Sequence, residues 1–317
     1  MKRLLLITIT LIWVTLLSSC CNGQKEDSVF MFSYFVGNGN DGLHLLYSED
    51  GLKWITLNEG KSFLTPEISN DKLMRDPYII EDDNGVFHMV WTVSWTERGI
   101  GYAYSTDLIN WSEQQYIPVM EHEPTTRNSW APEITYDKES KMFMIYWSST
   151  IPGLFPETQI EADAGYNHRI YYCTTYDFKE FSDTKLLYDP GFNVIDASIV
   201  PHDGKYVMFL KDETREPAKK SLHVATADNL TGPYSAASEA ITGNYWAEGP
   251  TSLIIDDKWI VYFDKYTDKK MGAVTSADLI NWEDISDDVE FPQGTRHGTA
   301  FTVKRSILDN ILKEYGK

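Results

Sequence analysis

The chain has 317 residues, of which 42% are hydrophobic and 14% aromatic, enough to bury one large all-β domain or two smaller ones. Its formal net charge of −19 excludes nucleic acid as a partner, because no basic surface is available to neutralise phosphates. The acidic balance suits a soluble protein that handles neutral ligands.

Residues 1–20 are predicted to form a lipoprotein-type signal peptide. A basic start precedes an apolar run at 4–17 that is short for a membrane span. The letters LSSC end at Cys20 and resemble a bacterial lipobox, in which that cysteine carries the lipid; the alternative is an ordinary secretory signal. We therefore expect residues 21–27 to form a short tether and the protein to be exported and lipid-anchored to a bacterial membrane, in the periplasm or at the cell surface.

The rest of the chain repeats one turn motif, in which a strand end is followed by an aspartate turn and an aromatic residue. Short polar side chains such as aspartate stabilise turns by hydrogen bonding to the backbone. The copies are YSEDGLKW (47–54), YSTDLINW (104–111) and TSADLINW (275–282), with weaker versions TTYDFKEF (174–181) and ATADNLTGPY (225–234).

Two strand signals recur with this turn. One is an aromatic-rich strand, and its copies are 29–35, 86–95, 142–150, 206–212 and 259–266. The other is a shorter strand that precedes the aromatic strand, with copies DPYIIED (76–82), APEITYD (131–137), DASIVPHD (196–203), EGPTSLIID (248–256) and HGTAFTV (297–303).

Five copies at a period of roughly 50–70 residues predict a single five-bladed β-propeller over residues 28–317. The aromatic strand at 29–35 has no short strand before it, and the short strand at 297–303 has no aromatic strand after it. We therefore expect one blade to combine strands from both ends of the chain, which closes the ring. A two-sheet sandwich would not explain the fivefold recurrence.

The start of each short strand is the candidate site. The first strand of a propeller blade lines the central channel, so these positions converge at one end of it. They hold, in chain order, Asp76, Glu133, Asp196, Glu248 and His297. Each could be a turn former taken singly, but four carboxylates and a histidine at equivalent places around one axis indicate a functional site.

The motifs RDPYI, WAPEI, VIDAS, AEGPT and RHGTA resemble those of glycoside hydrolase family 43, five-bladed propellers that cleave arabinosides and xylosides. The resemblance covers residues 28–303, although the alanine of VIDAS stands where the family often has proline. It implies that Asp76 is the general base, Glu248 the general acid, and Asp196 the carboxylate that orients the acid and tunes its pKa.

The chemistry of inversion is consistent with these roles. One carboxylic acid protonates the leaving oxygen while one carboxylate activates water on the opposite face of the sugar, at a separation of roughly 6.5–9.5 Å. Carboxylates on different blades suit such a gap. A third carboxylate near the acid raises its pKa by like-charge repulsion.

Further substrate contacts are expected beside these motifs, although core packing is the alternative for the aromatic residues and a structural ion pair for Glu133. The expected substrate-binding residues are Arg75, Trp95, Trp130, Glu133, Phe192, Trp246, Arg296 and His297. The histidines in long loops, His122 and His168, are interpreted as surface residues. No cofactor is required; the resemblance implies an optional structural calcium near His297, bound through water, but no EF-hand-like cluster of oxygen ligands is present.

The function predicted from these observations is an exo-acting, inverting glycoside hydrolase on plant-type polysaccharides or oligosaccharides, in first place an α-L-arabinofuranosidase. A β-xylosidase, or a galactofuranosidase or galactan-cleaving enzyme, is the alternative within the family. A non-catalytic propeller that binds glycans at the cell surface is the alternative from another class. We expect a monomer whose only contact with a membrane is the N-terminal lipid.

Overall fold

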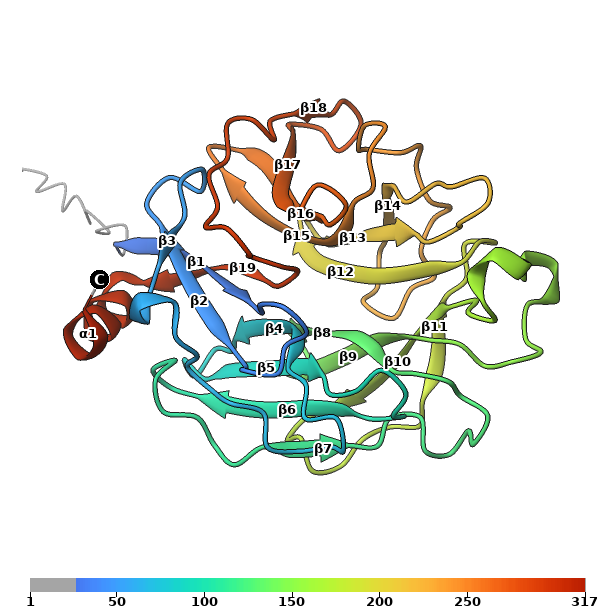
Figure 1. Ribbon diagram of the computed structural model, residues 1–317, viewed down its shortest axis with the longest axis horizontal. Helices are drawn as coiled ribbons and strands as arrows, with labels where there is room; N and C mark the ends of the chain where they lie inside the picture. The colour runs from blue at the N-terminus through green and yellow to red at the C-terminus, as the bar shows by residue number, and fades with distance from the viewer. Residues whose placement is uncertain (1–26, 317) are drawn as a thin grey trace, which may run out of the picture.

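The computed structural model describes residues 27–316, whose strands form five antiparallel sheets around a central axis (Figure 1). The sheets are the blades of a five-bladed β-propeller, so the predicted fold is confirmed. The lipoprotein signal, Cys20 and most of the tether lie outside the described residues. Among residues 27–316, no helix is long and apolar enough to span a bilayer.

Each blade is named here by its inner strand. From the inner strand outward, the β19 blade contains β19 (Ala300–Lys304), β1 (Ser28–Tyr34), β2 (His44–Ser48) and β3 (Ile55–Thr56), and the β4 blade contains β4 (Arg75–Glu81), β5 (Phe87–Thr92), β6 (Ile100–Ser105) and β7 (Gln115–Ile117). The β8 blade contains β8 (Trp130–Asp137), β9 (Met142–Ser149), β10 (Arg169–Thr175) and β11 (Lys185–Tyr188); the β12 blade contains β12 (Val194–His202), β13 (Lys205–Asp212) and β14 (Leu222–Ala227); and the β15 blade contains β15 (Glu248–Ile255), β16 (Lys258–Lys265), β17 (Lys270–Ser276) and β18 (Glu283–Asp284).

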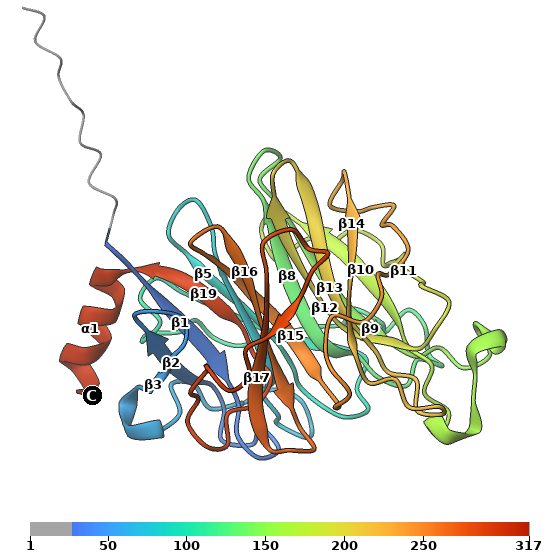
Figure 2. The same cartoon turned by 90° about the horizontal axis from the view of Figure 1, so that it is seen from above.

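The aromatic-rich strands are the second strands of the blades, as expected. Every side chain of β5 is buried, because the strand is covered on both faces by neighbouring blades. The inner strands gather at the centre and contact one another in turn, β4 with β8, β8 with β12, β12 with β15 and β15 with β19 (Figures 1 and 2). The starts of the inner strands are thereby brought close together.

The ring is closed by pairing the two ends of the chain. Strands β1 and β19 run antiparallel, with Ser28 opposite Lys304 and Phe32 opposite Ala300. The predicted closure is therefore confirmed, but the last inner strand begins at Ala300, and His297 lies in the bend before it. Just before this strand Gly298 approaches β1 closely, since an added Cβ would lie 1.8 Å from the carbonyl oxygen of Ser33.

The repeated aspartates form the expected turns. In four copies one carboxylate oxygen accepts hydrogen bonds of 2.7–3.1 Å from the backbone N–H groups two and three residues later. These are Asp50, Asp107, Asp177 and Asp278. In the weakest copy Asp228 instead forms an ion pair with Lys205 at 2.6 Å.

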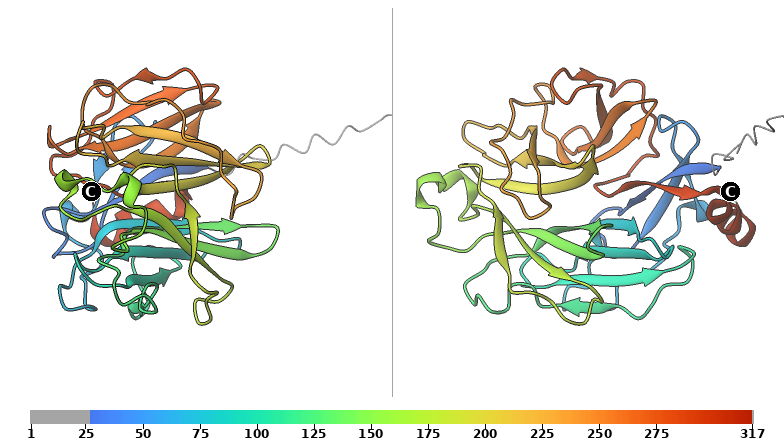
Figure 3. Two further views of the ribbon diagram at one scale, coloured as in Figure 1. Left: turned by 90° about the vertical axis from the view of Figure 1, so that its right-hand side faces the viewer. Right: turned by 180° about the vertical axis from the view of Figure 1, so that it is seen from behind.

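A C-terminal helix, α1 (Arg305–Tyr315), is not among the elements predicted from the sequence. It lies on the outside of the β19 blade, as Figures 2 and 3 show. Leu308 and Ile311 are buried in the cluster shared by the β19 and β4 blades. Short 3-10 turns complete the structure at η1 (Asn58–Gly60), η2 (Pro156–Thr158) and η3 (Glu161–Asp163).

Four inner strands begin with the same irregularity. The pairing with the second strand shifts register after the first residue of β4, β8 and β15, and after the second residue of β12, Ile195. The residue directly after each of these positions has a positive φ, and the values are 52° at Asp76, 43° at Ala131, 54° at Asp196 and 60° at Gly249. Each inner strand therefore enters the channel through a β-bulge.

The bulges correct one expectation from the sequence. Asp76 and Asp196 do occupy equivalent places, since both are the second residue of a bulge. Glu248 is the first residue of its bulge, and Glu133 lies two residues beyond Ala131. The prediction that all five candidate residues occupy equivalent positions is therefore wrong. A bulge adds a residue and re-aims the side chains on either side of it.

Candidate active site

A pocket of about 360 Å³ lies where the inner strands begin. The carboxylates Asp76, Asp196 and Glu248 all line it, and they come from β4, β12 and β15. The pocket is also lined by most of the other predicted site residues, namely Arg75, Trp95, Trp130, Trp246, Arg296 and His297. The structure thus brings together nine of the predicted residues from several blades.

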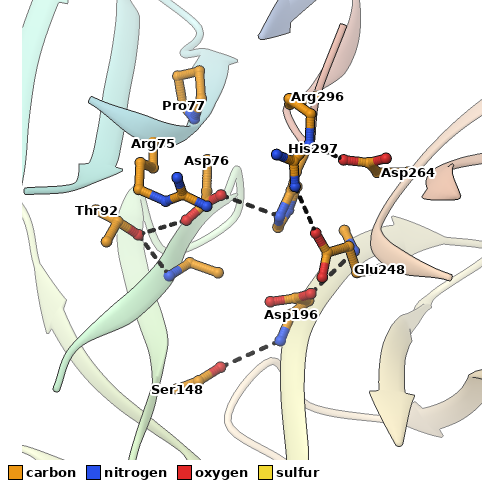
Figure 4. A network of polar contacts seen from close by, with 12 residues as sticks. Arg75, Asp76, Pro77, Thr92, Ser148, Asp196, Glu248, Asp264, Arg296 and His297 are labelled. Carbon is orange, nitrogen blue, oxygen red and sulfur yellow. Dashed lines mark hydrogen bonds and ion pairs between the residues drawn. The ribbon is translucent and has the colours of Figure 1, made fainter. Parts of the chain in front are cut away.

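Asp76 is held by neighbours on both oxygens (Figure 4). The Thr92 hydroxyl donates to Oδ2 at 2.8 Å, and His297 Nδ1 lies 3.4 Å from Oδ1. The same hydroxyl accepts a hydrogen bond from the backbone N–H of Ala131 at 2.8 Å, so it joins two blades at this point. The carboxylate is therefore fixed in one orientation at the wall of the pocket.

Asp196 is buried, and it contacts the backbone next to Glu248. Its Oδ2 accepts a hydrogen bond from the N–H of Gly249 at 3.1 Å. Burial raises the pKa of Asp196 to about 6, and the charges of Glu248 and Asp76 act in the same direction. His297 and Lys211, which lie nearby, oppose this rise in pKa. The residue thus positions the neighbouring strand and titrates close to neutrality.

Glu248 contacts two cations. Oε2 accepts a hydrogen bond from Lys211 Nζ at 3.1 Å, and Oε1 accepts one from an Arg296 NH group at 3.1 Å. Each cation has a second carboxylate partner, Glu213 at 2.6 Å from Lys211 and Asp264 at 2.5 Å from Arg296. Charge therefore alternates along a chain of five side chains with Glu248 at its centre.

A glycine is required beside Glu248. The φ of Gly249 is +60°, and an added Cβ would lie 2.2 Å from the ring of His297. The imidazole therefore packs directly over this peptide, which places His297 between Asp76 and the strand that carries Glu248.

One group of site residues is not found by the sequence reasoning. These residues lie near the ends of the second strands, opposite the first bulge residue of the same blade, and they are Thr92, Ser148, Lys211 and Asp264. Thr92, Ser148 and Lys211 reach the inner strand of the next blade; Ser148 Oγ, for example, accepts the N–H of Asp196 at 3.2 Å. Asp264 contacts Arg296, in the segment just before β19. The signal in the sequence is the polar residue that follows the apolar residues of each aromatic-rich strand.

The aromatic predictions are met only in part. The Arg75 guanidinium lies 4.3 Å from the ring centre of Trp95 and 4.6 Å from that of Phe35. The rings of Trp130 and Trp95 pack edge to face, with their centres 5.6 Å apart, and both side chains line the pocket. Phe192 does not line the pocket, because it packs against the core between the β8 and β12 blades.

Glu133 does not line the pocket either. It is 1% exposed, and its Oε2 accepts a hydrogen bond from the Tyr146 hydroxyl at 3.3 Å. Burial raises the pKa of Glu133 well above its usual range, despite a hydrogen bond from Ser198, and the charge of Asp196 adds to the rise. This carboxyl lies in the protein interior, two residues along β8 from Ala131.

His168 corrects another expectation. It is 1% exposed and lines the pocket, so its interpretation as a surface histidine is wrong. The reason is that the loop before β10 folds back over the β12 blade, where His168 hydrogen-bonds to Asn193. His122 is exposed at the surface, as expected.

The donor set for a calcium ion is not assembled near His297. Calcium takes six to eight oxygen ligands. Within residues 27–316 no group of three or more His, Cys, Asp or Glu side chains is arranged to hold a metal ion. An optional calcium bound through water beside His297 stays a prediction, and no residue role is assigned to a metal.

Comparison with known proteins agrees with the fold and the family. An α-L-arabinofuranosidase of Bifidobacterium longum subsp. longum is 24% identical over 212 residues, which are 58% of this chain and 20% of that protein. This chain thus spans about a fifth of the length of that curated relative.

The fold is shared with several solved structures. They include an α-L-arabinofuranosidase from Lactobacillus brevis (17% identity, TM-score 0.53, 67% of this chain and 72% of that one). A thermostable family-43 glycoside hydrolase is similar (18% identity, TM-score 0.53, 71% and 78%), as is an exo-β-1,3-galactanase from Phanerochaete chrysosporium (12% identity, TM-score 0.53, 72% and 51%). At these identities the likeness shows the fold alone.

The family model described as "Probable glycosyl hydrolase domain" matches residues 26–309. The match covers nearly all of the propeller, including every motif that carries the proposed site residues. The chain therefore belongs to the glycoside hydrolase family 43-related family.

Proposed function

We propose that this chain is an exo-acting, inverting glycoside hydrolase of plant-type polysaccharides or oligosaccharides, and specifically an α-L-arabinofuranosidase. The observation that carries the proposal is the meeting of Asp76, Asp196 and Glu248, from three different inner strands, in one pocket with aromatic walls. Inverting hydrolysis needs an acid and a base on opposite faces of the sugar, which residues from separate blades can supply.

In this mechanism Glu248 is the general acid and Asp76 the general base. Glu248 transfers its proton to the glycosidic oxygen as the bond from that oxygen to the anomeric carbon breaks. A water oxygen bonds to the anomeric carbon from the opposite face, and its proton passes to Asp76. Thr92 and His297 hold Asp76 in position for this transfer.

Asp196 is assigned a positioning role. Its hydrogen bond to the N–H of Gly249 fixes the peptide that carries Glu248. Its negative charge also lies near Glu248, as expected for a carboxylate that tunes a general acid.

The cation contacts of Glu248 add a requirement to this mechanism. Both of its oxygens contact a cation, whereas a carboxylic acid that protonates a leaving group must present one oxygen to it. We infer that the sugar displaces Arg296 from Glu248, because the Arg296 side chain is 29% exposed and that of Lys211 only 2%. Arg296 then remains paired with Asp264.

The choice of sugar is supported by similarity. The curated relative and one structural neighbour are named as α-L-arabinofuranosidases. A β-xylosidase or galactofuranosidase is the alternative, and a galactan-cleaving enzyme is favoured by the exo-β-1,3-galactanase among the structural neighbours. A glycan-binding propeller without catalysis is the alternative from another class.

A panel of nitrophenyl glycosides tests the proposal with the wild-type protein, Asp76→Asn and Glu248→Gln. We expect the α-L-arabinofuranoside to be cleaved fastest, and both variants to lose about 10²- to 10⁴-fold in turnover of unactivated arabinosides while keeping their circular dichroism spectra. Full activity of Glu248→Gln on unactivated arabinosides would reject Glu248 as the acid. Binding of sugars without cleavage of any would favour the non-catalytic alternative.

We further propose that the protein acts as an exported, monomeric lipoprotein anchored through Cys20, and that its activity needs no metal. In the producing bacterium, Cys20→Ser should move the protein from the membrane to the soluble fraction. Dialysis against a chelator should leave the turnover number unchanged, and loss of activity that calcium restores would reject the metal-free proposal.

A further inference from the structure

The loop that precedes β10 carries His168 into the wall of the pocket. Its ring stacks on Tyr166, with ring centres 5.3 Å apart and an interplanar angle of 8°, and packs against Trp130 at 5.1 Å. Arg127 covers the Tyr166 ring at 4.0 Å. The imidazole is therefore held in one place by aromatic neighbours, on the side of the pocket formed by the β8 and β12 blades.

Hydrogen bonds to Asn193 fix which ring nitrogen of His168 carries the proton. Asn193 Oδ1 accepts the backbone N–H of His168 at 2.8 Å, so the amide oxygen, rather than the amide nitrogen, faces this residue. Asn193 Nδ2 donates to Asp163 Oδ2 at 3.0 Å, which fixes the same amide orientation from the other end. His168 Nδ1 lies 3.0 Å from this oxygen and must therefore be the donor.

A neutral ring protonated at Nδ1 leaves Nε2 as a hydrogen-bond acceptor. Burial lowers the pKa of His168 to about 4, so the ring is neutral near pH 7. Within residues 27–316 no group hydrogen-bonds to Nε2. A buried acceptor without a partner is unfavourable, which indicates that a ligand or water supplies the missing donor.

We propose that His168 is a specificity-determining residue whose Nε2 accepts a hydrogen bond from a hydroxyl group of the sugar bound in the pocket. The inference rests on the proposed function, because it assigns a role in binding the same substrate. The partner must be a donor, so a neutral sugar with a hydroxyl at that position fits. A carboxylate or a deoxy position would leave Nε2 unpaired.

Two substitutions separate this role from a purely structural one. In His168→Asn the shorter amide can still donate to Asn193 but offers no acceptor at the position of Nε2. In His168→Gln the longer side chain places an amide oxygen near that position. His122→Asn is the matched control, because His122 is an exposed histidine in another loop.

The measurement is kcat/KM on the preferred sugar glycoside and on each of its monodeoxy analogues. We expect His168→Asn to lower kcat/KM about 3- to 10-fold on the parent sugar through a higher KM, the size expected for one hydrogen bond. His168→Gln should recover most of this loss. For one deoxy analogue, wild type and His168→Asn should be equal, since the donor is already missing. His122→Asn should match wild type throughout.

The outcomes distinguish this inference from the proposed function. If glycosides are cleaved and His168→Asn equals wild type on all of them, the inference alone is rejected. If His168→Asn and His168→Gln have equally lowered kcat on every analogue and both unfold at a lower temperature than wild type, His168 has only a structural role and the inference is again rejected. If wild type binds sugars but cleaves none, the proposed function is rejected, and the same comparison is made with dissociation constants. If wild type neither binds nor cleaves any sugar, both are rejected.

Discussion

Lys211 is a buried cation that contacts the candidate acid Glu248. It lies between Glu248 and Glu213, and it is almost fully buried. Burial alone would lower the pKa of Lys211, but these carboxylates raise it well above its usual range. Lys220 shares Glu213 with it, so the carboxylates of this part of the pocket are compensated by neighbouring cations.

Replacing Lys211 with methionine should destabilise the protein. The change leaves buried carboxylates with one cation fewer, which costs about 3 kcal/mol in the free energy of unfolding. Urea unfolding near neutral pH measures this loss of stability. Lys205→Met is the control, because the exposed ion pair of Lys205 with Asp228 contributes at most about 0.5 kcal/mol. Equal stability of the two variants would show that Lys211 compensates no buried charge.

Asp196 should make the stability of the protein depend on pH. Its pKa in the folded protein is about 6, above the value of an unfolded aspartate, so the folded state binds more protons between roughly pH 4 and 6. The contribution of Asp196 to the free energy of unfolding is therefore present at low pH and is lost as pH rises through about 6.

The variant Asp196→Asn removes this dependence. It should be more stable than wild type near pH 7 by about 1–3 kcal/mol, and the difference should disappear near pH 4. Unfolding by urea at both pH values measures it, and activity should be lost at both. A variant that is less stable than wild type near pH 7 would contradict the raised pKa.

The sequence identifies the three carboxylates because their motifs are distinctive. It does not identify Lys211, Asp264 or Thr92, because each acts on the next blade and the distance between blades is not encoded in local spacing. His168 is misread for a related reason, since its burial depends on a contact with Asn193 25 residues away.

At the level of elements, the β-bulges decide which side chains enter the pocket. The sequence shows where each inner strand begins but not the added residue that shifts the register. This is why Glu133 is predicted as a contact but is buried two residues beyond the bulge. When the motifs are aligned by sequence, Glu133 is placed at the position equivalent to Asp76. When the blades are aligned by strand pairing, Ala131 is the equivalent of Asp76.

The helix α1 should stabilise the ring without affecting chemistry. Leu308 is 1% exposed and packs in the cluster between the β19 and β4 blades, outside the pocket. Leu308→Ala should therefore lower the free energy of unfolding by about 2–5 kcal/mol and leave kcat/KM unchanged. Lys313→Ala, on the exposed face of the helix, is the control. A large change in kcat/KM with Leu308→Ala would show that the helix influences the site.

The helix could have been found from its pattern. Apolar residues at 307, 308, 311 and 312 recur at helical spacing. The preceding strand motif ends at 303, and the chain that follows has no turn signal of the repeated kind. The segment belongs to no blade, so the repeats do not predict its structure.

At the scale of the whole molecule, the five repeats are sufficient to predict the architecture. Each blade buries its second strand only against its neighbours, so a fivefold pattern requires a closed ring. Pairing of β1 with β19 completes it (Figure 1). The choice of sugar is set instead by the walls of the pocket, which combine residues from the loop before β10 with residues from four inner strands.

Asp76 and Glu248 are proposed to act from opposite faces of the sugar, so hydrolysis must invert the anomeric configuration. Proton NMR during cleavage of the preferred glycoside by the wild-type protein tests this directly. We expect the first sugar released to have the anomeric configuration opposite to that of the substrate, before mutarotation adds the other form. Release of the sugar with its configuration retained would contradict it.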